Sequence, residues 1–189
     1  MKKRLFVFTL LLLVCMMALF TACSKEERAY VYEASISNPG FERGDFSGWT
    51  VPGGFEVVES PNKSEKNEGR YFAKSSANGK GELVSEKFVL QDTGYVSFLI
   101  GAGDGDCYVA IYSGDTMIKQ VCNPYLTNHC DGVLRRVLVN LEEYVGKEIY
   151  FKIVDNSENL LYSYIIVDAF DVNVTVTDKA VYKAVSQEV

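Results

Sequence analysis

Short runs of alternating apolar and polar residues recur along the chain from residue 55 onward. They are rich in Tyr, Phe and Val, which suit a half-buried pleated surface. Turn formers separate the runs, and no run keeps a helical period with caps, apart from one turn near 141–144. The pattern predicts an all-β protein with strands at 55–59, 70–76, 82–90, 95–101, 107–113, 116–122, 134–141, 148–155 and 162–174.

The order of these strands predicts which loops lie together. In an antiparallel sandwich, successive strands run in opposite directions, so every second loop emerges at the same end. The loops 77–81, 101–106, 123–133 and 156–161 share one end, which we call the polar pole. They are long and rich in acids, amides and aromatics. Because binding residues tend to lie on long loops of a rigid scaffold, we expect the ligand site there.

The stretch 38–49 combines turn formers with aromatic residues. Gly40, Gly44 and Gly48 recur every fourth residue, and each would cost a helix about 1 kcal/mol relative to Ala. We therefore predict an irregular entry segment that closes one edge of the sandwich. Its aromatic residues are expected in the core: Phe41, Phe46 and Trp49.

The first 22 residues are typical of a secretory signal. Basic residues 2–4 precede the apolar stretch 5–20, which is shorter than the roughly 20 residues that span a membrane. Residues 21–23 resemble the lipobox of bacterial lipoproteins, which predicts lipidation of Cys23. The residues 24–27 that follow resemble tags carried by outer-membrane lipoproteins at the cell surface. We expect a lipid-anchored outer-membrane protein that faces outward.

Charge and length limit the class further. Removing the signal takes away three basic residues and no acid, which leaves 16 basic against 25 acidic side chains and a formal charge of −9. Such a chain is a poor partner for nucleic acid. The mature length suits one domain. The predicted organisation is a signal at 1–22, a lipidated Cys with a tether or edge strand at 23–36, a sandwich at 37–174 and a tail at 175–189.

Three further cysteines lie in the mature chain: Cys107, Cys122 and Cys130. An odd count in an oxidising compartment predicts one disulfide and one buried thiol. If residues 114–115 form a two-residue turn, Cys107 and Cys122 fall opposite each other, whereas Cys122 and Cys130 flank one loop. Both pairings stay open. A cysteine metal site is not expected, because the chain lacks CxxC spacing and a second histidine beside His129.

Catalytic motifs are weak. His129 is next to Cys130, but adjacent residues of an extended chain point to opposite sides. No GxSxG motif occurs. A small glycoside hydrolase is a less favoured alternative, since it needs two carboxyls about 5 to 9 Å apart in a cleft. We predict that the protein is not an enzyme.

A series of short motifs follows in chain order over roughly residues 38–172. They are Phe41-Glu42-x-Gly-x-Phe46-x-Gly48-Trp49, Gly69-Arg70-Tyr71-Phe72, Gly94-Tyr95-Val96-Ser97-Phe98, Tyr108-Val109-Ala110, Leu141-x-x-Tyr144-x-Gly146-Lys147 and Ile165-x-Val167-Asp168-x-Phe170. The series resembles the jelly-roll accessory module, of galactose-binding-like fold, found beside fructan-cleaving enzymes of glycoside hydrolase family 32. The resemblance implies a two-sheet antiparallel jelly-roll β-sandwich that binds polysaccharide, with levan or inulin as the expected ligand.

The resemblance also implies site residues. Tyr162 and Tyr164 stand where members have Trp and His, and a tyrosine ring can cover the apolar face of a sugar. Asp155, Asn156 and Arg135 can hydrogen-bond its hydroxyls. With the other polar-pole side chains, the predicted carbohydrate site is Asp104, Asp106, Tyr125, His129, Arg135, Asp155, Asn156, Tyr162 and Tyr164.

Jelly-roll sugar-binding modules often hold a structural calcium between a Glu of the first segment and an Asp of the last strand. Glu42 and Asp168 match these places. Calcium takes oxygen ligands, which two carboxylates and backbone carbonyls would supply. The alternative is a pair of acids bonded to backbone amides or a nearby Lys, and both interpretations stay open.

The expected function is polysaccharide capture by a non-catalytic cell-surface lipoprotein, which passes its ligand to an outer-membrane transporter or a glycoside hydrolase. The alternative is a structural or protein-interaction lipoprotein on the same fold. That alternative predicts a flat apolar patch at the polar pole instead of an aromatic cleft.

Overall fold

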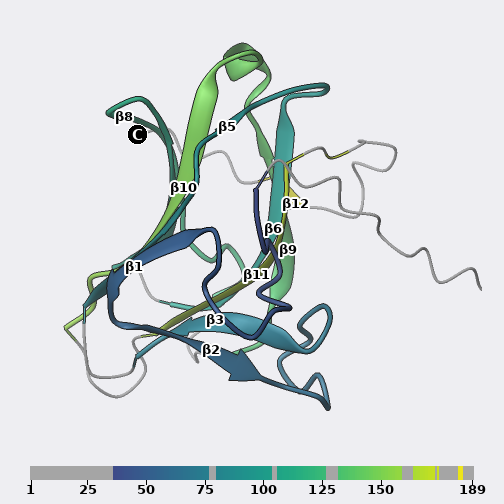
Figure 1. Ribbon diagram of the computed structural model, residues 1–189, viewed down its shortest axis with the longest axis vertical. Helices are drawn as coiled ribbons and strands as arrows, with labels where there is room; N and C mark the ends of the chain where they lie inside the picture. The colour runs from purple at the N-terminus through teal and green to yellow at the C-terminus, as the bar shows by residue number, and fades with distance from the viewer. Residues whose placement is uncertain are drawn as a thin grey trace, which may run out of the picture. The chain divides into compact units, whose positions relative to one another are not determined.

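The computed structural model describes residues 36–76, 80–103, 106–126, 132–158, 164–172 and 174, and the backbone of 183–184. Within this part of the chain, the strands form two sheets that pack face to face (Figure 1). Several predicted features lie outside it: the signal, Cys23, most of the first edge strand, Asp104, His129, Cys130 and Tyr162. Those predictions, and the predicted domain boundaries, stay predictions.

Sheet A has the strand order β1-β4-β10-β7-β8, and β5 pairs with β10. Every pairing in it is antiparallel. The strands are β1 (Trp49–Gly53), β4 (Gly81–Ser85), β5 (Phe88–Val89), β7 (Cys107–Ser113), β8 (Thr116–Val121) and β10 (Glu148–Asp155).

Sheet B has the order β12-β9-β6-β11-β3-β2. Its pairings are antiparallel except that β12 runs parallel to β9, so the predicted tail contributes a short strand. The strands are β2 (Phe55–Glu59), β3 (Tyr71–Ser75), β6 (Tyr95–Ala102), β9 (Arg135–Asn140), β11 (Ile165–Asp171) and β12 (Lys183–Ala184). The all-β, two-sheet antiparallel prediction is confirmed.

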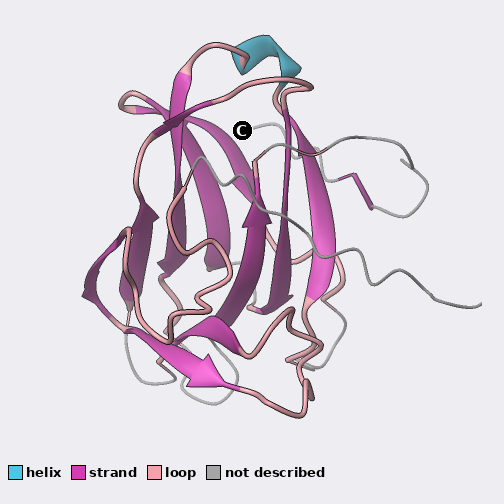
Figure 2. Ribbon diagram, turned by 45° about the vertical axis from the view of Figure 1, so that its right-hand side comes forward, coloured by secondary structure: helices cyan, strands magenta, loops and turns pink. Residues whose placement is uncertain are grey.

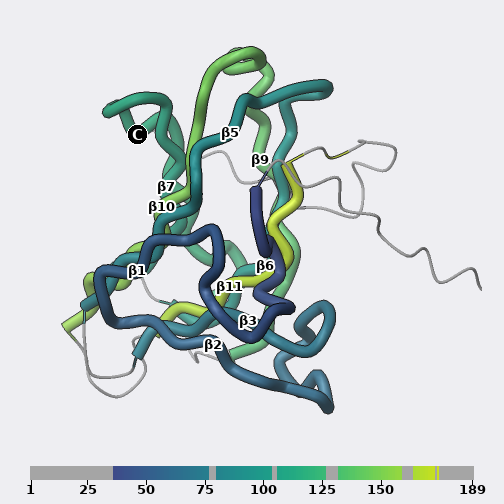
Figure 3. The backbone as a smooth tube through the Cα atoms, in the orientation of Figure 1, coloured from purple at the N-terminus to yellow at the C-terminus, as the bar shows by residue number. Residues whose placement is uncertain are grey.

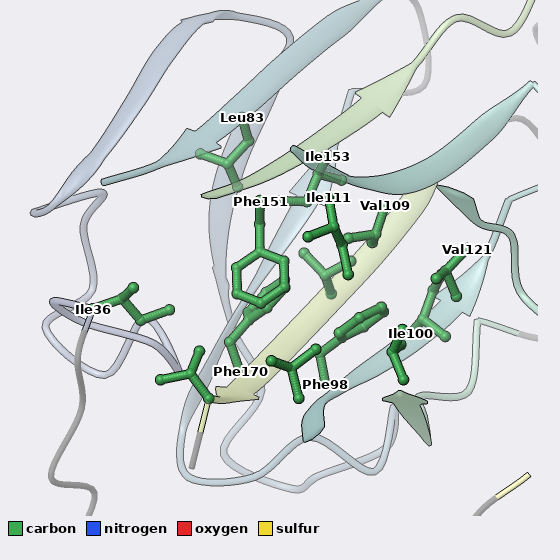
Figure 4. Packing of buried hydrophobic residues seen from close by; sticks show 14 of the residues in the cluster. Ile36, Leu83, Phe98, Ile100, Val109, Ile111, Val121, Phe151, Ile153 and Phe170 are labelled. Atoms are coloured by element: carbon green, nitrogen blue, oxygen red, sulfur yellow. The ribbon is translucent and has the colours of Figure 1, made fainter. Parts of the chain in front are cut away.

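The core lies between the sheets, where inward side chains of alternating strand residues meet. Phe98 of sheet B, Phe151 of sheet A and Phe170 of β11 form its centre (Figure 4). The Phe170 ring centroid lies 5.2 Å from that of Phe98 and 5.0 Å from that of Phe151. These three rings join the two sheets, since aromatic pairs stabilise beyond the area they bury.

The entry segment closes this core as the sequence predicted. Phe41 is fully buried, and its ring centroid lies 5.2 Å from that of Trp49 and 5.9 Å from that of Phe46. The Phe170 amide donates a hydrogen bond to the Pro39 carbonyl at 3.0 Å, so the start of the described chain lies beside β11 (Figure 3).

The predicted polar pole is present. Asp155 pairs with both Cys107 and Gly81, and Ile165 pairs with Ala102, so the ends of these strands meet at one end of the sandwich. The shorter loops lie at the other end, where the predicted helical turn appears as the 3-10 helix η1 (Glu142–Tyr144; Figure 2).

The hairpin between β7 and β8 corrects one of the two cysteine pairings. Ser113 pairs with Thr116 across the predicted two-residue turn, but a bulge between Ile111 and Tyr112 shifts the register by one residue. Because a one-residue shift moves side chains to the other face, Cys107 lies in the core whereas Cys122 lies on the outer face. The two sulfurs are not joined in a disulfide, and the Cys122–Cys130 pairing stays a prediction.

The described residues all belong to one compact unit of the chain, which begins at Glu33. A search of this described part for a helix long and apolar enough to cross a membrane finds none.

Candidate functional site

Asp155 lies at the polar pole, and its side chain is almost fully buried there. The residue is 2% exposed. Its oxygens accept hydrogen bonds from the Ser75 hydroxyl at 2.6 Å, the Cys107 thiol at 3.3 Å, and the amide and hydroxyl of Ser157 at 3.1 and 2.7 Å. Ser75 in turn accepts from the Ile165 amide at 2.9 Å. The Asp155 side chain thus joins sheet A to sheet B, and its predicted role as a ligand group stays a prediction.

Asp106 and Asn156 meet at the pole as predicted. Both are exposed, and the Asn156 amide donates to the Asp106 carbonyl at 3.0 Å. Beside Asn156 lies a pocket of about 320 Å³, which we call the glycine pocket. It is lined by Pro52, Gly53, Gly54, Lys80, Gly81, Glu82, Val154, Asp155 and Asn156.

Glycines allow the backbones to approach closely in this pocket. Gly54 has a φ of +78°, and a Cβ there would come within 2.7 Å of the Gly81 Cα. A side chain at either position would therefore displace the neighbouring strand end. Lys80 forms an exposed ion pair with Glu158 at 3.0 Å at the rim.

Tyr164 lines a second pocket, of about 280 Å³, on the outer side of sheet B. We call it the tyrosine pocket, and its lining residues are Ser64, Glu65, Phe72, Lys74, Gly132, Tyr164 and Ile166. The Lys74 ammonium lies 4.8 Å from the Tyr164 ring centroid, a cation–π distance. The hydroxyls of Ser60 and Ser64 hold the pKa of the Glu65 carboxyl below its ordinary value. Two aromatic residues, Tyr164 and Phe72, and two charged groups, Lys74 and Glu65, therefore line this concavity.

Tyr125 and Arg135 form a neighbouring pair. The Arg135 guanidinium lies 5.8 Å from the Tyr125 ring centroid, and the Tyr125 hydroxyl donates to the Arg136 carbonyl at 3.1 Å. Both side chains are half-buried. Their predicted role in binding stays a prediction, as it does for the other site residues.

Glu42 and Asp168 converge on one loop, at residues 67–71. The Glu42 carboxylate accepts from the Arg70 amide at 2.9 Å and from the Tyr71 amide at 3.1 Å. Asp168 accepts from the Glu68 amide at 2.8 Å and from the Ala169 amide at 2.7 Å. The arrangement matches the alternative in which the acids bond to backbone amides.

Two groups at this loop, the Asp168 carboxylate of β11 and the Asn67 side-chain oxygen, nevertheless fit a cation site. Asp168 is fully buried, and this burial raises its pKa to about 8 although the two amides favour the charged form. Asn67 is 3% exposed, and its Oδ1 has no hydrogen-bond partner among the described residues. A buried acceptor and a buried carboxylate beside it are groups that a hard cation stabilises.

No group of three or more His, Cys, Asp or Glu side chains suited to a metal occurs within the described ranges. A calcium here would therefore depend on Asn67 and on backbone carbonyls as well as on the two acids.

Sequence reasoning missed Ser75, Lys74 and Glu65. Lys74 and Ser75 lie in a strand, and Glu65 lies in a loop that was assigned no role. Alternation along the predicted strand 70–76 puts neighbouring residues on opposite faces, but it does not say what each one contacts. That depends on contacts between residues 80 or more positions apart.

No known family model matches the chain, and no curated protein does either. Among solved structures, TmCBM61 in complex with beta-1,4-galactotriose is 20% identical, with a TM-score of 0.49 over 71% of this chain and 94% of that one. The K1 cleaved adhesin domain of Lys-gingipain from Porphyromonas gingivalis W83 is 17% identical, with a TM-score of 0.49 over 69% and 93%. The CBM22-2 xylan-binding domain from Paenibacillus barcinonensis Xyn10C is 13% identical, with a TM-score of 0.42 over 72% and 98%.

Proposed function

We propose that this protein is a non-catalytic lipoprotein that binds a neutral polysaccharide at the polar pole. Its ligand is a fructan such as levan or inulin. A lipid on Cys23 anchors it to the outer membrane, facing outward, where it delivers the ligand to a transporter or a glycoside hydrolase. The observation that carries the proposal is the tyrosine pocket, which reaches the polar pole through Gly132 of the loop 123–133.

The chemistry of this pocket suits a sugar ring. A sugar has an apolar face of C–H groups and a rim of hydroxyls, so it needs a flat apolar surface and nearby donors and acceptors. The Tyr164 ring supplies the surface, above a floor of Phe72 and Ile166. Lys74 supplies donors and Glu65 supplies acceptors.

The exposed apolar residues favour this function over the assembly alternative. Across the described residues, the exposed large hydrophobic side chains are Val89, Leu126 and Val145. Leu126 alone of these belongs to a polar-pole loop. A protein-interaction surface at the pole would need a contiguous apolar patch.

Affinity gel electrophoresis with levan, inulin and other neutral polysaccharides tests binding. We expect at least one to retard the wild-type protein, and Tyr164→Ala to lose most of the retardation. Tyr95→Ala is a matched control, because Tyr95 is a half-buried tyrosine at the other end of sheet B. Absence of retardation by every glycan would refute the proposal.

Separation of cell lysates into membrane and soluble fractions tests the lipid anchor on Cys23. The wild-type precursor expressed in a Gram-negative host should enter the membrane fraction, whereas Cys23→Ser should not. Recovery of both proteins in the soluble fraction would remove the lipoprotein part of the proposal while leaving the glycan site untouched.

We also propose a structural calcium held by Glu42, Asp168 and Asn67. The ion would neutralise the buried Asp168 carboxylate and satisfy the Asn67 oxygen, which fixes the entry segment to the loop 67–71. Calcium should raise the melting temperature and a chelator should lower it, with no calcium effect in Asn67→Ala. A melting temperature that ignores both reagents would leave only the amide-bonded arrangement.

A further inference from the structure

The outer face of sheet A has an unusual composition for a solvent-facing surface. On β7 the inward residues Cys107, Val109 and Ile111 belong to the core, so the alternate residues point outward. The same alternation turns Tyr150 and Lys152 of β10 outward, opposite Tyr112 and Ala110. We call the outward set the tyrosine face: Tyr108, Tyr112, Tyr150, Lys152 and Glu82.

Two of the tyrosines form an ordered pair. Tyr112 and Tyr150 are cross-strand partners whose ring centroids lie 5.2 Å apart with an angle of 11° between the planes. Both are half-buried, so part of each ring reaches solvent. Because each ring packs on the other, the pair presents a surface whose orientation is fixed before any ligand arrives.

The middle of the face is closely packed. Ala110 points outward but is fully covered, because its larger neighbours Tyr108, Tyr112 and Lys152 stand around it. The Lys152 ammonium is held by Glu82 at 2.7 Å, so the two charges cancel. Burial raises the pKa of Tyr108, which keeps its hydroxyl neutral and able to donate.

The tyrosine face continues into the glycine pocket at the pole. Glu82, which belongs to the face, lines that pocket from β4, and Val154 lines it from β10. From Val154 to Tyr150 is four residues along β10, or about 13 Å. A ligand that starts in the glycine pocket can therefore run along β10 to the tyrosine pair.

We propose that the tyrosine face binds a second stretch of the same neutral polysaccharide chain, as an extension of the polar-pole site. The proposal rests on the proposed function. Rings with hydroxyls match a sugar chain, which offers C–H faces and hydroxyls along its length. The face carries no net charge, since Lys152 and Glu82 pair with each other. An uncharged chain is thus its electrostatic match.

Other occupants fit less well. A polyanion would meet a chain with a formal charge of −6, and the cation on this face is already paired. A second copy of this protein would need an apolar interface core. Of the exposed large hydrophobics of the described residues, Val89 alone lies in sheet A, paired with Glu148 beside the tyrosine face, while Leu126 and Val145 lie in loops, so they form no apolar core.

The test compares long and short ligands of the same glycan. The variant Tyr112→Leu/Tyr150→Leu keeps apolar volume, so the fold should survive, but it removes both flat rings. We expect it to weaken polysaccharide binding about tenfold, with binding of a disaccharide unchanged. Tyr164→Ala should weaken both ligands, and Tyr95→Ala should affect neither. Isothermal titration calorimetry on the mature protein measures these affinities.

Several outcomes would overturn the inference. Equal polysaccharide affinity in the double variant and the wild type would refute it while leaving the polar-pole site in place. Sedimentation velocity could show that the wild type is a dimer and the double variant a monomer. That result would make the face a self-association surface instead. If no glycan binds the wild type at all, the proposed function fails first and this inference fails with it.

Discussion

The outer faces of the two sheets are built from similar antiparallel strands but have different surroundings. On sheet B, residues 60–70 form a covering segment over the outer face, where Phe72 is 2% and Ile166 is 1% exposed. The segment is held by a hydrogen bond from the Leu134 amide to the Glu65 carbonyl at 2.8 Å and by the Arg136–Glu68 ion pair. On sheet A, the tyrosine face has no such cover within the described chain, and its side chains stay half-exposed.

The difference concerns stability, because the proposed recognition sites lie on both faces: the tyrosine pocket on sheet B and the tyrosine face on sheet A. Apolar side chains under a covering segment stabilise the fold because they are removed from water. Amphipathic tyrosines and a paired Lys–Glu tolerate water, so they can remain exposed and still contact a ligand. The covered face should therefore be sensitive to truncation and the open face tolerant.

Truncation of a single aromatic on each face tests this most strongly. Phe72→Ala should lower the free energy of unfolding by about 3–5 kcal/mol, because it leaves a cavity under the covering segment. Tyr112→Ala should cost less than about 1.5 kcal/mol, since its ring is half-exposed. Urea denaturation followed by circular dichroism measures both. Similar losses would show that the two faces do not differ as described.

The second-largest predicted change in the free energy of unfolding comes from Asp168, whose buried carboxyl lies on the covered face of sheet B. Its pKa is about 8 when folded and near 3.9 when unfolded. The folded protein therefore holds a proton that the unfolded chain releases, so this stabilisation is present below about pH 4 and is lost as the pH rises through 8.

With a chelator present, the free energy of unfolding should fall by on the order of 2 kcal/mol between pH 6 and pH 8. Asp168→Asn should remove that slope, since the amide does not titrate. Denaturation curves at several pH values check both. The same slope in wild type and variant would assign it to another group.

Asp155, at the pole where the two sheets meet, should give a smaller loss. Asp155→Asn keeps the shape but weakens the hydrogen bonds from Ser75 and Ser157, because a charged acceptor binds more strongly than a neutral one. We expect about 1–2 kcal/mol of lost stability and unchanged glycan affinity well below the melting temperature. Loss of binding with stability intact would support the predicted role of Asp155 as a ligand group.

The smallest effect belongs to the ion pair of the open face. Glu82→Gln should change the free energy of unfolding by less than about 1 kcal/mol, because Glu82 and Lys152 are both partly exposed to solvent. The matched control is Glu148→Gln, which removes the exposed Lys87–Glu148 pair. A clearly larger loss at Glu82 would mean that the open face contributes to stability after all.

Patterns along the chain predicted the strands, the polar pole and the aromatic entry segment, because these follow from local rules. Alternation fixes which residues point inward, and antiparallel order fixes which loops share an end. The prediction missed β1, since its Trp49 was assigned to the entry segment and Gly53 interrupts its pattern.

The cysteines show that local rules do not predict strand register. The turn at 114–115 was predicted, but the bulge between Ile111 and Tyr112 depends on how β7 and β8 pack in the sheet. One inserted residue moves the following side chains to the opposite face. The sequence therefore predicted the hairpin and not the register that separates Cys107 from Cys122.

What the sequence determined by itself is the all-β class, the alternation that builds the core, and the pole at which the long loops gather. The tertiary structure decided which outward residues are covered and which stay open. Phe72 and Tyr112 both alternate outward from their strands, yet one lies under residues 60–70 and the other forms a stacked pair on an open face. Burial depends on segments distant in sequence, so periodicity along one strand cannot assign it.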